Sequence, residues 1–171
     1  MLYTLFQHIS KYIPIQDAAA HCDIPCKIYD PITTQLAALS VIRFLDLINA
    51  LEDTGSSLSL NQQAQLIRLV HEKEVHAAKV KDEVRIIWGD FFKQPQLEQL
   101  PDTHQLVHDI MLAASACKQS TERENGEKLL GLVNQFSQYF WQAKGIQTYK
   151  AVCPYPPEKE LVYPLLAKSD N

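Results

Sequence analysis

Apolar residues recur every third position along residues 32–51, and this spacing predicts an amphipathic helix with one buried face. The helix is expected to begin at Asp30-Pro31, because Asp is a good N-cap and Pro suits the first helical position. The predicted inward positions are Leu36, Leu39, Ile42, Leu45 and Ile48. The polar run Asp-Thr-Gly-Ser-Ser at 53–57 then breaks the pattern.

Two more boundaries can be read from capping residues. Ser59 and Gln62 match a capping box at the start of a long helix without Pro, over about residues 60–92. Asp102 is expected to cap a third helix that ends near Cys117. The intervening residues 93–101 contain two prolines and are expected to form a loop.

A fourth helix is predicted after the polar connector 120–125, and Gly145 is a natural stop just after its last residue, Lys144. No strand pattern competes with these helices. Four helices with short links predict an all-α fold, an antiparallel four-helix bundle over residues 32–145. The tail 146–171 is expected to be an arm that packs on the bundle or on a neighbouring subunit, or a docking segment for a maturation partner.

Composition places this bundle among ordinary globular domains. The 171 residues are 46% hydrophobic and 21% charged, and the net charge of −4 disfavours a general nucleic-acid role. No run of eighteen apolar residues exists, so no membrane span is expected. Residues 1–20 carry only Lys11 and Asp17 as charges and make a poor secretory signal. We expect a cytoplasmic protein.

The most distinctive segment, residues 21–31, comes directly before the first predicted helix. It reads His-Cys-Asp-Ile-Pro-Cys-Lys-Ile-Tyr-Asp-Pro and brings together His21, Cys22 and Cys26. Two soft thiolates beside an imidazole are ligands for a thiophilic transition metal. The cysteines are not at the C-x-x-C spacing of a redox pair or a zinc ribbon, and no second Cys/His pair stands at zinc-finger spacing.

Additional donors would come from the backbone if the chain began at His21. A free amine at His21 and the amide nitrogen of Cys22 would join the two thiolates in a plane, which suits Ni(II) or Cu(II), with the His21 imidazole left as an axial ligand. This arrangement requires a cut after Ala20, where three alanines precede His21. Residues 1–20 are therefore interpreted as a propeptide. An uncleaved N-terminal helix and a pair of structural or disulfide cysteines are the alternatives.

The segment resembles the metal hook of the nickel-containing superoxide dismutases, whose motif is H-C-x-x-P-C-x-x-Y, here His21, Cys22, Pro25, Cys26 and Tyr29. The similarity extends over about residues 21–144 and includes supporting stretches at 87–93, 101–107 and Phe140-Trp141. It implies a nickel ion, conversion of superoxide to oxygen and hydrogen peroxide, a four-helix bundle, assembly as a homohexamer, and removal of the leader by a dedicated maturation protease.

The resemblance also implies roles for single residues. His21, Cys22 and Cys26 would bind nickel. Tyr29 would shape the approach of superoxide or donate a proton, and packing of its ring is the simpler alternative. Asp23 and Pro25 would set the backbone of the hook. Lys93, or Lys27 within the hook, would attract the anion, although each also fits an ordinary solvated lysine.

Three positions depart from the family pattern. The family orients its axial histidine through a glutamate and an arginine, and these positions fall on Ala37 and near His76, while a family tyrosine is Phe91 here. Glu72 or Glu74 is a candidate to replace part of that network. The alternative function is accordingly a non-enzymatic nickel- or copper-binding helical protein; a helical interaction module whose cysteines bind no metal is a further alternative.

Other histidines and cysteines are weaker candidates. His71 and His76 are five apart, about 140° around a helix, too far for one metal. His104 and His108 share a helix face, but no third ligand is expected to converge on them. Cys117 is expected to be a small buried hydrophobe.

Overall fold

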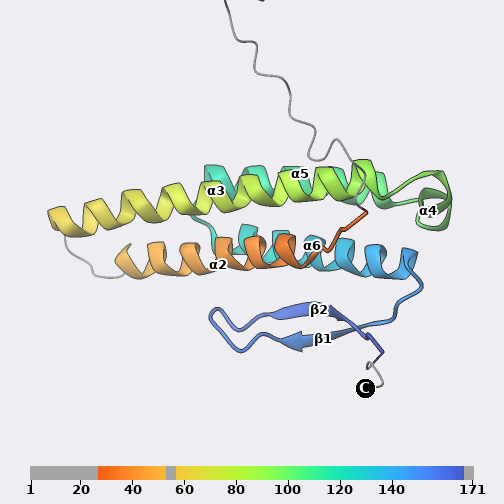
Figure 1. The fold of residues 1–171 in the computed structure, drawn as a ribbon. Helices are drawn as coiled ribbons and strands as arrows, with labels where there is room; N and C mark the ends of the chain where they lie inside the picture. The colour runs from red at the N-terminus through yellow and green to blue at the C-terminus, as the bar shows by residue number, and fades with distance from the viewer. Residues whose placement is uncertain (1–26, 53–56, 168–171) are drawn as a thin grey trace, which may run out of the picture.

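The computed structural model describes residues 27–52 and 57–167, which form five helices and two strands. Four long helices are packed side by side, and a β-hairpin lies against two of them (Figure 1). The elements are α2 (Ile32–Glu52), α3 (Leu60–Asp90), α4 (Gln94–Gln99), α5 (Thr103–Gln119), α6 (Arg123–Ala143), β1 (Thr148–Val152) and β2 (Glu160–Pro164).

The start of α2 confirms the signal read from Asp30-Pro31. The Asp30 Oδ1 accepts a hydrogen bond from the Ile32 amide at 2.8 Å, and the Pro31 carbonyl accepts one from the Gln35 amide at 3.1 Å. The predicted inward positions of α2 are buried except for Leu36, which is 41% exposed. The capping box of α3 is also present, with Gln62 Oε1 accepting from the Ser59 amide at 2.9 Å.

The four long helices are consistent with the predicted antiparallel four-helix bundle. α2 packs on α3 and α6, and α5 packs on α3 and α6, so the four long helices close around one apolar core. At Gly126 a Cβ would lie 3.0 Å from side-chain carbons of Ile42 and Leu45, so glycine allows α6 to approach α2 closely. α2 is long and apolar enough to resemble a membrane span, but half of that window is buried inside the bundle, as in a core helix.

Two boundaries differ from the prediction. The expected loop 93–101 contains the short helix α4, because the Pro95 near its start fits the first turn and Gln96 Oε1 accepts from the Lys93 amide at 3.1 Å. The connector 120–125 is shorter than predicted, since α6 already begins at Arg123. Arg123 Nε donates to Asp46 Oδ1 on α2 at 2.6 Å, a contact that the local sequence does not reveal.

The expectation of no strands was wrong for the tail. β1 and β2 pair antiparallel with Tyr149 opposite Tyr163, and the hairpin packs on the bundle as an arm. Gln35 of α2 binds the edge of β2 that does not pair with β1. The Gln35 Nε2 donates to the Val162 carbonyl, and the Gln35 Oε1 accepts from the Val162 amide, both at 2.9 Å. Asn134 Nδ2 donates to the Glu160 carbonyl at 2.9 Å. Helix side chains therefore replace a third strand.

Candidate metal centre

The predicted nickel ligands His21, Cys22 and Cys26, together with Asp23 and Pro25, lie outside the described residues. The description begins at Lys27, the residue directly after Cys26. The structure therefore describes the residues that follow the hook, and the ligand assignments stay predictions.

The residues after the hook attach it to the bundle within four positions. Lys27 has a φ of 59°, a left-handed conformation that is uncommon for a side-chain-bearing residue and turns the chain sharply. Ile28 is 81% exposed, whereas Tyr29 is half-buried and Pro31 is buried. The hook thus joins the bundle through the Tyr29 ring and the capped start of α2.

Tyr29 lies against an aromatic cluster at the end of the bundle. Its ring centroid is 6.4 Å from that of Phe91, which in turn lies 4.6 Å from Phe140 and 5.1 Å from Phe92. Phe140 contacts Trp141 at 5.0 Å with perpendicular rings. Two sequence stretches that support the family resemblance, one at the end of α3 and one near the end of α6, therefore meet beneath Tyr29.

Lys144 adds a cation to this cluster. Its Nζ lies 5.2 Å from the Phe91 centroid and 5.1 Å from the Phe140 centroid, within the range of a cation–π interaction. The sequence alone did not point to Lys144 as a member of this cluster. Its position four residues after Phe140 is the local signal, because residues four apart in a helix share a face.

Lys93 lies just after α3, at the start of α4. Its Nζ donates to the Gly89 carbonyl at 2.7 Å, so the ammonium group lies at the C-terminal end of α3. A cation there is stabilised by the unpaired carbonyls of the last helical turn. Lys93 is exposed, and its role in attracting an anion stays a prediction.

The three altered positions are distributed over the bundle. Ala37 is buried in the core, and Phe91 is the centre of the aromatic cluster. His76 Nδ1 donates to the Glu72 carbonyl at 2.9 Å, and the His76 ring packs on Phe44 with centroids 5.2 Å apart. At 1.5 Å per residue, His76 lies roughly 20 Å along α3 from Phe91 in the same chain.

The described residues hold no group of three or more His, Cys, Asp or Glu side chains that could bind a metal. His104 and His108 are both exposed, and His104 Nδ1 accepts a hydrogen bond from Trp88 Nε1 at 3.0 Å. A neutral His104 then carries its proton on Nε2.

Cys117 is fully buried beside the buried Lys73, as the sequence predicted for the cysteine. The Lys73 Nζ donates to the carbonyls of Ser120 and Lys118, at 2.6 and 3.2 Å, and so satisfies two carbonyls at the C-terminal end of α5. Burial lowers the pKa of Lys73 and raises the pKa of Cys117 to about 11, because both charged forms are disfavoured away from water. Cys117 is therefore a protonated thiol at neutral pH and a poor metal ligand.

These observations define a class: an antiparallel helical bundle with a His/Cys metal motif directly before its first helix. The comparisons with known proteins agree. The family model of nickel-containing superoxide dismutase matches residues 16–144. The chain is 34% identical over 133 residues to "Superoxide dismutase [Ni]" from Streptomyces coelicolor, covering 78% of this chain and 95% of the relative, and equally similar to the protein of that name from Streptomyces seoulensis.

Solved structures give the same result. A native nickel superoxide dismutase structure at 1.30 Å is 35% identical with a TM-score of 0.61, covering 72% of this chain and 99% of the other. A structure of a Ni-containing superoxide dismutase after partial X-ray-induced reduction is 34% identical to this chain, with a TM-score of 0.64. The match covers 73% of this chain and 99% of the other. This chain belongs to the nickel-containing superoxide dismutase family.

Proposed function

We propose that the mature protein is a nickel superoxide dismutase, which converts two superoxide ions and two protons to oxygen and hydrogen peroxide. Membership of the family carries this conclusion, because the family match spans the hook and the whole bundle. The anchoring of Tyr29 on the Phe91 cluster supports it, since the residues after the hook contact the stretches that the family resemblance singled out.

His21, Cys22 and Cys26 are the proposed nickel ligands. Their imidazole and thiolate groups suit nickel, and the described residues contain no competing cluster. Nickel, when bound, supplies the one-electron oxidation and reduction that dismutation requires. Cleavage before His21 frees the terminal amine as a further donor, so residues 1–20 act as a propeptide and a maturation protease is required.

Other residues of this chain position the hook and guide the substrate. Asp23 and Pro25 set the hook backbone, and Tyr29 lies at its base, where a phenol can hold or deliver a proton. Lys93 and Lys27 are the cations proposed to attract superoxide, and Lys27 is exposed next to the ligand Cys26. Assembly as a homohexamer and a cytoplasmic location complete the proposal.

The alternative is a non-enzymatic nickel- or copper-binding protein. It is favoured by Ala37, His76 and Phe91, which replace residues that tune the metal site in the family. Loss of outer-shell partners typically reduces metal affinity or activity by about 10–100-fold. A protein with intact ligands and an altered surrounding shell would bind the metal and turn over slowly.

The test is to compare three forms of the protein: the chain beginning at His21, the full chain, and the trimmed Cys26→Ser variant. Bound nickel is measured by elemental analysis and superoxide decay by stopped-flow absorbance. We expect nickel and dismutation only in the trimmed wild-type form. Nickel binding without dismutation would establish the non-enzymatic alternative. Absence of nickel from the trimmed form would refute the proposal and leave an interaction module.

A further inference from the structure

The C-terminal hairpin lies beyond residue 144, where the family match ends, so it is an addition to the family's bundle. It is also rich in exposed apolar side chains. Of the eleven large hydrophobic residues exposed in the described part of the chain, five lie between 149 and 166. They are Tyr149, Val152, Tyr155, Leu165 and Leu166, with exposed fractions of 39–62%. An apolar concentration of this kind on a short surface element marks an interaction site.

The two edges of the hairpin differ. The edge of β2 faces the bundle, where Gln35 pairs with both main-chain groups of Val162 and Asn134 pairs with the Glu160 carbonyl. Pro164, the next residue on this edge, has no N–H to satisfy. The β2 edge is therefore closed by helix side chains, and β1 is the strand farther from α2 and α6 (Figure 1).

The edge of β1 is open. Val162 directs its N–H and C=O away from β1, so its partner Lys150 directs its own groups away from β2. The bonds from the Leu165 amide to Gln147 and from the Cys153 amide to Lys159 agree with this alternation. Thr148, Lys150 and Val152 thus present main-chain groups that bond to no described residue, a row that can pair with another strand.

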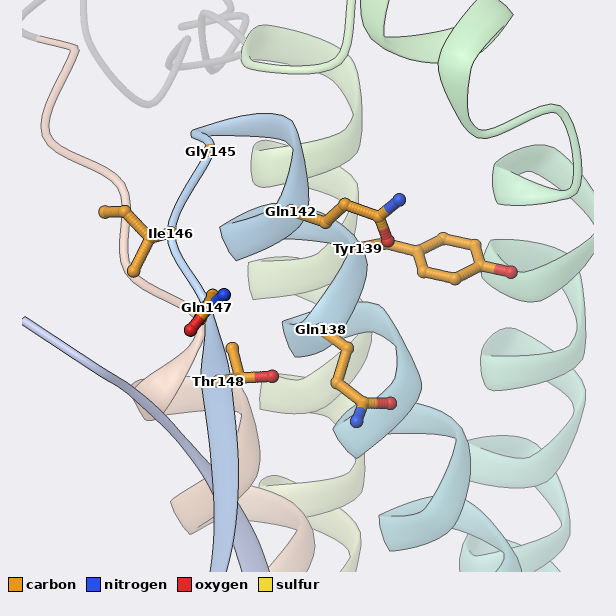
Figure 2. Close-up of a pocket in the computed structure, with 7 residues that line it drawn as sticks. All are labelled: Gln138, Tyr139, Gln142, Gly145, Ile146, Gln147 and Thr148. Atoms are coloured by element: carbon orange, nitrogen blue, oxygen red, sulfur yellow. The ribbon is translucent and has the colours of Figure 1, made fainter.

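The pocket beside this strand does not compete for the edge. It has a volume of about 580 Å³ and is lined by α6 and the segment that leads into β1, including Gln138, Tyr139 and Gln142 (Figure 2). Of the β1 residues, Thr148 lines this pocket, and Lys150 lines a smaller one of about 300 Å³ together with Asn134 and other residues of α6. Tyr149, Lys150 and Val152 are exposed.

We propose that the open edge of β1 pairs antiparallel with β1 of a second copy of this chain, with Tyr149 opposite Tyr149 of the copy. In this register Thr148 and Lys150 of one copy pair with Lys150 and Thr148 of the other, so the open main-chain groups meet. A register shifted by one residue pair would place Lys150 opposite Lys150, and like charges directly opposite are destabilising.

The proposed register is self-complementary in its side chains. Tyr149 already stacks on Tyr163 with ring centroids 5.7 Å apart and an interplanar angle of 28°. Pairing about Tyr149 extends this into a row of four tyrosines across a four-stranded sheet. Leu165, paired with Gln147 through the main chain, lies on the same face and is 61% exposed. The second copy thus covers exposed aromatic surface as well as the open edge.

The sharpest test is cysteine cross-linking in the full chain with Cys22→Ser and Cys26→Ser, which removes the hook thiols, while Cys117 and Cys153 are buried. Directly opposite residues have Cβ atoms about 4.5–5.5 Å apart, so Tyr149→Cys is expected to form a disulfide-linked dimer under mild oxidation. Val152→Cys is the matched control. It is also exposed, at 59% against 51% for Tyr149, but would lie about 20 Å from its copy in this register, and it should not cross-link. A dimer from Val152→Cys as readily as from Tyr149→Cys, or from neither, would overturn the proposal.

A second measurement uses the processed, nickel-loaded protein. Because the proposed function already includes a homohexamer, sedimentation velocity at increasing concentration should show a further association of hexamers. Tyr149→Asp should abolish this step, and Leu112→Asp, at a site on α5 that is 56% exposed, should retain it. Equal association in both variants would count against the edge, as would binding to a different protein with no association beyond the hexamer. Nickel content and dismutation should be unchanged in both variants, so failure here is distinct from failure of the proposed function.

Discussion

The hook-bearing end of the bundle and the C-terminal hairpin are held in different ways. The hook anchor rests on packed rings, with Phe140 fully buried between Phe91 and Trp141. The hairpin adds side-chain amides to its apolar burial: Gln35 bonds to Val162 across 127 residues of sequence, and Leu161 and Val162 are buried. The packed rings belong to the cooperative core, whereas a terminal hairpin with fewer buried residues can open by itself. The comparison predicts global effects for changes in the first region and local effects in the second.

The largest effect is expected for Phe140→Ala. Removing this buried ring leaves a cavity among Phe91, Trp141 and Lys144 and should lower the free energy of unfolding by about 3–5 kcal/mol. Urea denaturation followed by circular dichroism measures it. Val152→Ala, at a hairpin site that is 59% exposed, is the control and should change stability by less than about 0.5 kcal/mol. Similar losses in the two variants would contradict the distinction between the regions.

The next largest effect is expected for Gln35→Leu. The buried N–H and C=O of Val162 would lose their partners, at about 1–3 kcal/mol. Hydrogen exchange should accelerate in residues 148–164 and stay slow in the core of α6. Gln63→Leu is the matched control, because Gln63 makes only an exposed bond to the Leu58 carbonyl. Unchanged exchange in the hairpin would show that apolar burial alone holds it.

A smaller effect is expected for Arg123→Met. Arg123 pairs with Asp46 on α2 and with Glu127 one turn further along α6. Glu127 also accepts a hydrogen bond from Lys159 of the hairpin at 2.7 Å. Partly exposed ion pairs contribute about 0.2–1 kcal/mol and weaken in salt. Thermal unfolding at low and high salt should show a loss that is larger at low salt. Arg85→Met, which removes the exposed pair with Asp82 within α3, should have less effect.

The smallest effect is an acid dependence of the hairpin. The hydrogen bonds from Lys159 and then Arg123 lower the pKa of Glu127. A carboxyl whose folded pKa lies below its unfolded value of about 4.3 stabilises the fold above that pH and loses this contribution as the pH falls. Hairpin amides should therefore exchange relatively faster below about pH 4.3 in the wild type than in Glu127→Gln. Equal acid sensitivity of the two proteins would show that Glu127 does not cause the acid dependence of the hairpin.

Some features of the candidate site could be predicted from the sequence, and others became visible only in the structure. The spacing of His21, Cys22 and Cys26 predicted a nickel site without a structure, and the family match agrees with that metal, because ligand type and spacing are local properties of the chain. The cation above the Phe91 and Phe140 rings was not found, since Lys144 and Phe91 are 53 positions apart and meet only when α3 and α6 pack. Lys93 was selected from its motif, but its bond to Gly89 became visible only in the structure.

The sequence by itself determined the four long helices, their caps at Asp30 and Ser59, and the family of the metal motif. Periodicity and capping act within a few residues, so they can be read directly from the chain. Only the tertiary structure decided that residues 148–164 form a hairpin and which of its edges stays open. Five-residue strands carry too little periodic signal, and their placement depends on Gln35 and Asn134, which come from distant helices.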